Sequence, residues 1–112
     1  LILFKKGKEA ISSLKSLSDK LFNEIFDGVP QKNISSKLLD DEIEIIDALV
    51  FHTGFLSSNG EARRSLKENS ISVNKQKVDI NKRITKIDLI ADKYVLLQKG
   101  KKNYFIISVS DI

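Results

Sequence analysis

The sequence predicts an α+β fold, in which amphipathic helices pack on a small, mostly antiparallel sheet. Apolar residues recur every three or four positions over residues 8–27 and again over about 42–53, which indicates helices. Apolar and polar residues then alternate over residues 93–98 and 103–110, which indicates a β-hairpin. We therefore expect an α+β domain.

The leading helix is expected to end at Gly28, because Pro30 prevents its continuation. Its apolar face is too wide for an isolated helix, so it must dock on another surface. The polar face mixes acids with lysines, which argues against a helix that lies on a membrane. We expect a leading helix within residues 1–30, a linker over 31–41 and a compact domain over 42–112.

Three consecutive acids, Asp40, Asp41 and Glu42, precede the second helix. They allow two interpretations, a metal site or a helix N-terminus whose dipole favours negative charge. We favour the second, because no matching set of ligands occurs elsewhere. His52 is the single histidine and cysteine is absent, so the sequence predicts neither a zinc site nor a catalytic nucleophile with its base.

The next helix, over residues 61–69, carries start and stop signals. Ser58 or Asn59 is expected to be the N-cap, and Glu61 places a carboxylate in the first turn. Asn69 is expected at the C-terminal end, because asparagine tolerates the left-handed conformation that follows many helices.

This helix is predicted to have one apolar and one basic side. Ala62 and Leu66 are four residues apart and must face a core. Arg63 and Lys67 are also four apart, and Arg64 lies on the same arc. Arginine can hold phosphate oxygens with two hydrogen bonds, so this arc is the first candidate for binding a polyanion.

After this helix the pattern predicts a sheet. A strand over residues 71–73 is expected to return at 77–78 through a turn at 74–76, and residues 84–90 suggest short extended or turn structure. In the final strand apolar residues occur on both faces, represented by Ile106 and Ile107. Both faces of the sheet are therefore expected to be at least partly covered.

The positive charge is concentrated in the second half of the chain. The net charge is +4, but residues 1–60 hold seven lysines and nine acids, whereas residues 61–102 hold twelve basic residues and five acids. This asymmetry favours a polyanion as partner. No apolar run approaches the roughly 20 residues that span a bilayer, so no membrane partner is expected. The chain has no methionine, which suggests a fragment of a longer protein.

The order of several short motifs resembles a known family. The αL RNA-binding motif, named after small-subunit ribosomal protein S-four, has a serine, a Glu-Ala-Arg-Arg run, a lysine and a Val-Asn pair. Here these are Ser58, Glu61–Arg64, Lys67 and Val73–Asn74. The tail over residues 93–104 is similar to the end of bacterial tyrosyl-tRNA synthetases. Residues 43–110 match well and the first 30 loosely.

The sequence departs from the family pattern at two turns. Asn69-Ser70 and Asn74-Lys75 stand where Gly-Gly and Asn-Gly are frequent. Asparagine adopts positive φ at modest cost, so the fold is expected to tolerate both changes.

The resemblance implies that this chain binds tRNA(Tyr), by the anticodon stem and the long variable arm. A catalytic domain of the same polypeptide would attach tyrosine with ATP. This chain has neither synthetase signature, so we expect no catalytic residue, metal or cofactor in it. The parent protein is expected to be a cytoplasmic homodimer. The residues expected to contact RNA are Ser58, Arg63, Arg64, Lys67, Asn74, Lys75, Lys77, Lys101 and Lys102.

Two alternatives remain at this point. One is the αL domain of another RNA-modifying or ribosome-associated protein, such as a pseudouridine synthase. The other is a protein-interaction module whose basic face is merely solvated. The aromatic residues do not suggest a platform for stacking bases, because they stand among aliphatic residues and are expected in the core. These residues are Phe51, Phe55, Tyr94 and Phe105.

Overall fold

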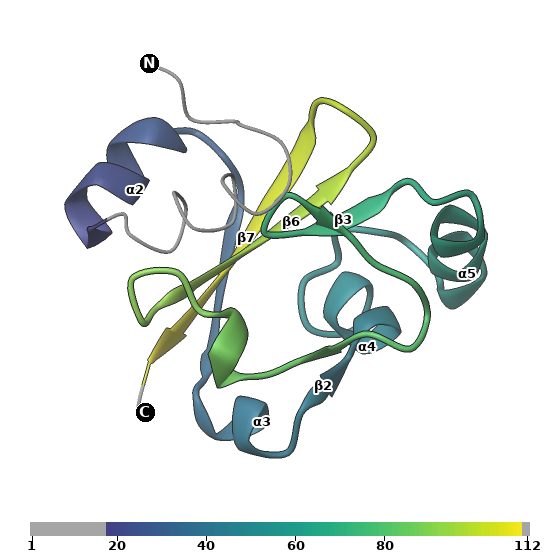
Figure 1. Ribbon diagram of the computed structural model, residues 1–112, viewed down its shortest axis with the longest axis horizontal. Coiled ribbons are helices and arrows are strands. Elements are labelled where there is room, and N and C mark those ends of the chain that lie inside the picture. Colours follow the sequence, from purple (N-terminus) through teal and green to yellow (C-terminus); the bar gives the residue numbers. More distant parts are fainter. Residues whose placement is uncertain (1–17, 111–112) are drawn as a thin grey trace.

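A five-stranded mixed sheet lies at the centre of the computed structural model, which describes residues 18–110 (Figure 1). The strand order is β1-β7-β6-β3-β4, and only the β1–β7 pair is parallel. A separate pair is formed by β2 and β5. The strands are β1 (Gln31–Ser35), β2 (Ile43–Glu44), β3 (Ile71–Val73), β4 (Gln76–Lys77), β5 (Arg83–Ile84), β6 (Tyr94–Lys99) and β7 (Asn103–Ser110).

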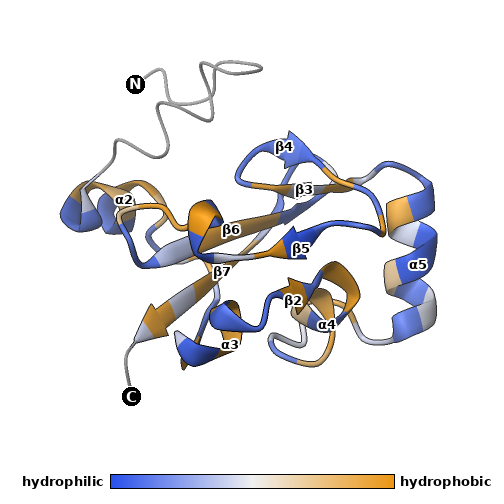
Figure 2. Ribbon diagram, turned by 60° about the horizontal axis from the view of Figure 1, so that its bottom comes forward, coloured by the Kyte–Doolittle hydropathy of each residue, from blue (hydrophilic) through white to orange (hydrophobic). Residues whose placement is uncertain are grey.

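Helices cover both faces of this sheet, as Figure 2 shows with α2 on one side of β6 and β7 and α3 and α4 on the other. The α+β fold predicted from the sequence is therefore confirmed, including the β6–β7 hairpin. The first residues of the leading helix expected over 8–27 lie outside the described part of the chain. The helices are α2 (Asp19–Ile25), α3 (Lys37–Asp40), α4 (Ile45–Leu49), α5 (Asn59–Lys67) and the 3₁₀-helix η1 (Lys86–Asp88).

The segment expected to be a linker, residues 31–41, is instead part of the fold. It forms β1, which pairs with β7 along five residues, and then α3. The sequence did not reveal this strand because Ile34 is its single buried residue and the others are polar. Side chains reinforce the pairing, since the Asn33 amide donates to Ser108 Oγ at 3.0 Å and accepts from Ser110 Oγ at 2.9 Å.

The three acids before the second predicted helix do not cap it. Asp40 ends α3, Asp41 follows as its C-cap, and Glu42 adopts a left-handed conformation with φ of 58°. The helix expected over 42–53 is shortened to α4, because the pairing of β2 with β5 keeps Ile43 and Glu44 extended. Asp40 instead forms an ion pair with Lys86 at 2.6 Å. In residues 18–110 no group of three histidines or acids is arranged to hold a metal.

Two apolar cores lie on opposite faces of the sheet, which confirms the expectation that both faces are covered. Alternation along β7 divides its side chains, so that Ile107 and Val109 join the larger core and Ile106 joins the smaller. The larger core contains the buried apolar residues of α3, α4 and α5. The smaller core contains Phe22 from α2 and Phe26, the C-cap of that helix.

The described part of the leading helix docks on the sheet of this chain. Phe22 is fully buried and its ring stacks on that of Tyr94, with centroids 4.3 Å apart. The Tyr94 hydroxyl donates to the Asp19 carboxylate, and Lys93 lies 3.5 Å from the same carboxylate. The Tyr94 hydrogen bond is the main cause that lowers the pKa of Asp19. No helix within 18–110 has the length and apolar character needed to cross a membrane.

The aromatic residues expected in the core differ in their actual positions. Tyr94 is buried, as predicted, and Phe55 and Phe105 are partly buried against the larger core. The prediction for Phe51 is wrong, because its side chain is 81% exposed. The cause is the early end of α4 at Leu49, after which the chain turns and no longer follows helical spacing.

Candidate nucleic-acid interface

Helix α5 begins with a side-chain cap that Ser58 supplies, so Ser58 and not Asn59 is the N-cap of the two candidates in the sequence. Its hydroxyl accepts a hydrogen bond from the Glu61 backbone N–H at 3.1 Å. The Glu61 carboxylate accepts in return from the backbone N–H and the hydroxyl of Ser57, at 2.9 and 3.0 Å. Ser58 was expected to contact RNA, and the structure shows it exposed but engaged in starting the helix.

Helix α5 has one side in the core and one side in solvent. Ala62 and Leu66 are buried, whereas Arg63, Arg64 and Lys67 are exposed. None of these three basic residues forms an ion pair with any residue within 18–110. The outer arc of α5 therefore presents three unpaired cations on a rigid element.

Asn74 was expected to contact RNA, but its side chain is only 5% exposed. The amide donates to the Asp88 carbonyl at 2.5 Å and accepts from the Leu96 backbone N–H at 2.9 Å. Both hydrogen-bonding ends of the side chain are therefore used inside the protein. Asn74 joins the end of β3 to β6 and to η1, which is a structural role.

Lys75 is the second residue of the β3–β4 turn, and Lys77 lies two residues later on β4. Asn74 and Lys75 both have positive φ, 51° and 70°, in the two-residue connection between the strands. The Lys75 ammonium lies 2.7 Å from the Tyr104 hydroxyl and 4.9 Å from the centroid of the same ring. Lys77 is exposed on β4. Lys75 is therefore held in part by Tyr104, whereas Lys77 is exposed to solvent.

The tip of the β6–β7 hairpin contributes the remaining predicted residues. Lys101 and Lys102 are both exposed in the turn. The Gly100 N–H donates to the Ser70 carbonyl at 2.8 Å, which fastens this turn to the segment that follows α5. Lys99 Nζ lies 3.2 Å from the Glu61 carboxylate. These contacts bring the basic hairpin tip beside the basic helix.

The carboxylate of Glu61 is held in its charged form. The Ser57 backbone N–H is the main cause, and the Ser57 hydroxyl and Lys99 add to it, so that the pKa falls from the ordinary 4.5 to about 2. Glu61 is therefore negative at neutral pH. The sequence did not reveal the contact with Lys99, because these residues lie on different elements, 38 positions apart.

The arrangement is suited to binding phosphate groups. The exposed cations are Arg63, Arg64 and Lys67 on α5, Lys77 on β4, and Lys101 and Lys102 at the hairpin tip. Such cations hold a nucleic-acid backbone and set its position without reading its sequence.

This chain is similar to part of several known proteins. The family model for the tyrosine–tRNA ligase SYY-like C-terminal domain matches residues 22–107. A tyrosine–tRNA ligase of Flavobacterium johnsoniae is 50% identical over 108 residues, which are 96% of this chain and 25% of that protein. One of Porphyromonas gingivalis is 37% identical over 109 residues, again 96% of this chain and 25% of the relative. This chain thus spans about a quarter of the length of these relatives.

A solved structure shares the fold. It is described as the solution structure of a tyrosyl-tRNA synthetase C-terminal domain, and it superposes with a TM-score of 0.65 at 20% identity. The match covers 96% of this chain and 99% of that one. The fold, the family model and the curated relatives agree, and the chain belongs to the tyrosine–tRNA ligase SYY-like C-terminal domain family.

Proposed function

We propose that this chain is the tRNA-binding part of a tyrosine–tRNA ligase. It holds the anticodon stem and the long variable arm of tRNA(Tyr), while a catalytic domain of the same polypeptide attaches tyrosine in an ATP-dependent reaction. The names of the relatives support the substrate. The same proposal includes a homodimeric parent protein in the cytoplasm, with ATP bound outside this chain.

The unpaired cations on α5 are the observation that carries this proposal. Arg63, Arg64 and Lys67 lie on its outer arc, and its inner arc is fixed in the larger core. A guanidinium can bind two phosphate oxygens at once. Because RNA helices expose their backbone and a shallow groove, a protein recognises them largely by shape and by phosphate contacts. A rigid row of cations matches such a target.

The experiment that tests the proposal measures binding of this chain to tRNA(Tyr) with and without its long variable arm, at two salt concentrations. If about five phosphates are neutralised, a fourfold rise in salt weakens binding by roughly two orders of magnitude. Removal of the arm is expected to weaken binding further, because the arm supplies part of the contacted backbone.

Other outcomes point to other functions. Equal, salt-sensitive binding to both RNAs would indicate a general RNA-binding module and would contradict the role of the arm. An affinity that does not change with salt concentration would contradict the electrostatic interface. Absence of binding to both RNAs, with a folded chain, would favour a protein-interaction module whose basic face is only solvated.

A further inference from the structure

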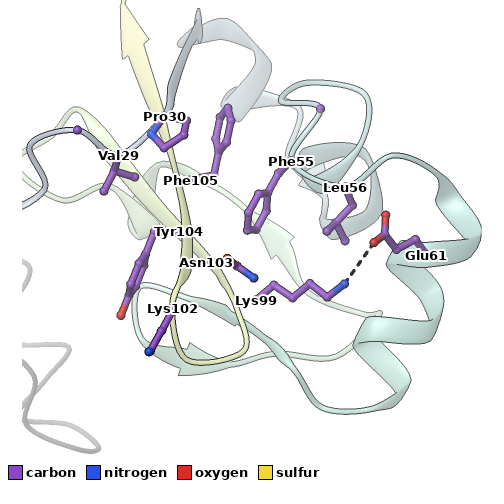
Figure 3. Close-up of a pocket in the computed structure, with 12 residues that line it drawn as sticks. Val29, Pro30, Phe55, Leu56, Glu61, Lys99, Lys102, Asn103, Tyr104 and Phe105 are labelled. Atoms are coloured by element: carbon purple, nitrogen blue, oxygen red, sulfur yellow. Dashed lines mark hydrogen bonds and ion pairs between the residues drawn. The ribbon is translucent and has the colours of Figure 1, made fainter.

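A groove of about 690 Å³ lies between the hairpin tip and the start of α5. Four segments line it: the α2–β1 connection, the loop before α5, the first turn of α5 and the β6–β7 hairpin (Figure 3). Its size falls in the range of sites for small molecules, roughly 300–1,000 Å³. The lining includes Pro30, Phe55, Tyr104 and Phe105 together with Lys99 and Lys102.

The aromatic rings of the groove keep part of their surface open. Phe55 and Phe105 are only partly buried against the larger core, and Tyr104 is partly buried against the smaller core, whereas Phe22 is fully buried. The centroids of Phe55 and Phe105 are 5.7 Å apart with the rings tilted by 40°. Figure 3 shows the Phe55 ring near Lys99 and Asn103, and the Phe105 ring beside Pro30. They therefore offer apolar, aromatic surface on which a flat ring can stack.

Polar groups of opposite kinds surround these rings. Lys102 is exposed at the rim and provides a cation, and the exposed Asn103 provides an amide. At the other end the Glu61 carboxylate, bonded to Lys99, faces the groove and can accept a hydrogen bond from an N–H group (Figure 3). A ligand with a flat ring, N–H donors and a negative group would satisfy all three features.

We propose that this groove binds one unpaired nucleotide of the RNA, with its base stacked on Phe55 and Phe105 and its phosphate beside Lys102. This site deepens the proposed function and rests on it, because the nucleotide belongs to the RNA that α5 holds. Adenine, cytosine and guanine can donate to Glu61 from an exocyclic amino group, whereas uracil can donate only from its ring N3–H. Base–aromatic stacking tolerates different bases and adds to the affinity that phosphates provide.

The charge of the surroundings favours a nucleotide over an apolar peptide. The groove adjoins the exposed Lys101 and Lys102 of the hairpin tip and, through Lys99 and Glu61, the first turn of α5. The cations of α5 begin two residues after Glu61. An RNA backbone on that helix therefore passes near the groove, and an unpaired nucleotide needs only to turn inward.

The test uses a synthetic RNA hairpin with a five-nucleotide loop and the same hairpin with abasic residues throughout the loop. Both RNAs carry the same phosphates, so their difference isolates the bases. The chain as it stands is expected to bind the abasic RNA about tenfold more weakly. Phe55→Leu keeps an apolar side chain but removes the ring, and it should lose the same factor on the normal loop. On the abasic loop it should lose nothing further.

Phe51→Leu is the matched control, because Phe51 is an exposed ring outside the groove. It should change neither binding constant, and thermal unfolding checks that each variant folds. If Phe55→Leu does not fold, Phe105→Leu provides the same comparison from β7. Equal binding of the two RNAs to the unchanged chain would overturn the proposal, as would an equal loss in Phe51→Leu.

The two proposals fail in different ways. Suppose that the double variant Arg63→Ala with Arg64→Ala abolishes salt-sensitive binding although the unchanged chain binds the abasic and the normal loop equally well. In that case the RNA interface stands and the groove proposal is overturned. If neither hairpin binds at any salt concentration, the groove proposal is overturned together with the proposed function. If the groove variants weaken only the contact with the remaining polypeptide, the groove is a contact between domains and the nucleotide is excluded.

Discussion

Helix α5 and the β3–β4 turn were both expected to contact RNA, and the structure shows that their polar side chains differ in exposure and in bonding. On α5 the cations Arg63, Arg64 and Lys67 are exposed and have no ion-pair partner in the described chain. In the turn Asn74 is buried with both ends of its amide bonded, and Lys75 contacts Tyr104. A motif match therefore identifies a segment, and burial decides which of its residues can reach a ligand.

The physical reason for this difference is the regularity of each element. In a helix with a buried side at Ala62 and Leu66, the 3.6-residue period fixes which side chains point outward. In a two-residue turn with both φ angles positive, no such period exists. The direction of Asn74 follows from its contacts with β6 and η1, which come from distant parts of the chain.

Asn74→Ala is expected to have the largest effect on folding. It removes two hydrogen bonds and leaves the Leu96 N–H and the Asp88 carbonyl without these partners. Alanine is also disfavoured at positive φ. We expect the free energy of unfolding to fall by about 2–4 kcal/mol, measured by urea denaturation. Lys77→Ala, an exposed change three residues later, is the control and should stay within about 0.5 kcal/mol.

An opposite result for Asn74 would contradict the difference between the β3–β4 turn and α5. If Asn74→Ala keeps its stability and loses RNA affinity, the side chain must leave its internal partners to contact RNA. The turn would then resemble α5 in function.

Arg63→Ala combined with Arg64→Ala should change RNA binding and leave folding unchanged. Two lost phosphate contacts should weaken binding of tRNA(Tyr) by roughly tenfold or more near physiological salt. The slope of log affinity against log salt should become shallower by about two. The free energy of unfolding should change by less than about 0.5 kcal/mol, because both side chains are exposed.

Glu68→Gln provides the matched control on the same helix. Glu68 is exposed at the C-terminal end of α5, and the change removes a negative charge near the proposed interface. RNA affinity should rise slightly. A double arginine variant with unchanged affinity and salt slope would show that α5 is not the interface.

Two substitutions of Lys75 separate the effect of the strained backbone from the effect of the contact with Tyr104. Lys75→Gly removes the contact with Tyr104 but relieves the left-handed conformation, whereas Lys75→Ala removes the contact and keeps the strain. Glycine should therefore be more stable than alanine by about 1 kcal/mol in thermal or urea unfolding. If both variants unfold alike, the turn relaxes and Lys75 is not held in a strained conformation.

Much of this fold is encoded in local patterns. The cap at Ser58, the two sides of α5 and the β6–β7 hairpin all follow from residues within a few positions of one another, and each was predicted. The strand at 31–35 was missed, because Ile34 alone marks it and its partner β7 lies 75 residues away. Phe51 was misplaced, because the helix that would have buried it ends early.

The candidate site also has a part that local patterns predict and a part that forms only on folding. The exposure of the α5 cations was predictable from helical spacing. The groove beside Phe55 and Phe105 was not, because a loop, a strand and the α2–β1 connection form it only after folding. The sequence placed those rings among aliphatic residues, and the structure places them where the core meets solvent.

The smallest expected effect concerns the pH dependence of α5. The pKa of Glu61 is about 2, below its ordinary 4.5, so the folded state prefers the charged carboxylate. This stabilisation is present above about pH 4.5 and is lost as pH falls through 2. Glu61→Gln should therefore be less stable than the unchanged chain at pH 6, and the gap should close as pH falls toward 2. Urea unfolding at pH 6 and near 2 measures it.

Lys99→Ala tests which contact lowers the pKa of Glu61. The main cause is the Ser57 N–H, which this variant retains, and Lys99 contributes less. Lys99→Ala should therefore keep most of the pH dependence, whereas Glu61→Gln removes the part that Glu61 provides. If Lys99→Ala removes it as completely, the ion pair between hairpin and helix, and not the cap, fixes the start of α5. The position of the cations would then depend on the hairpin, and α5 would lose the independence that distinguishes it from the β3–β4 turn.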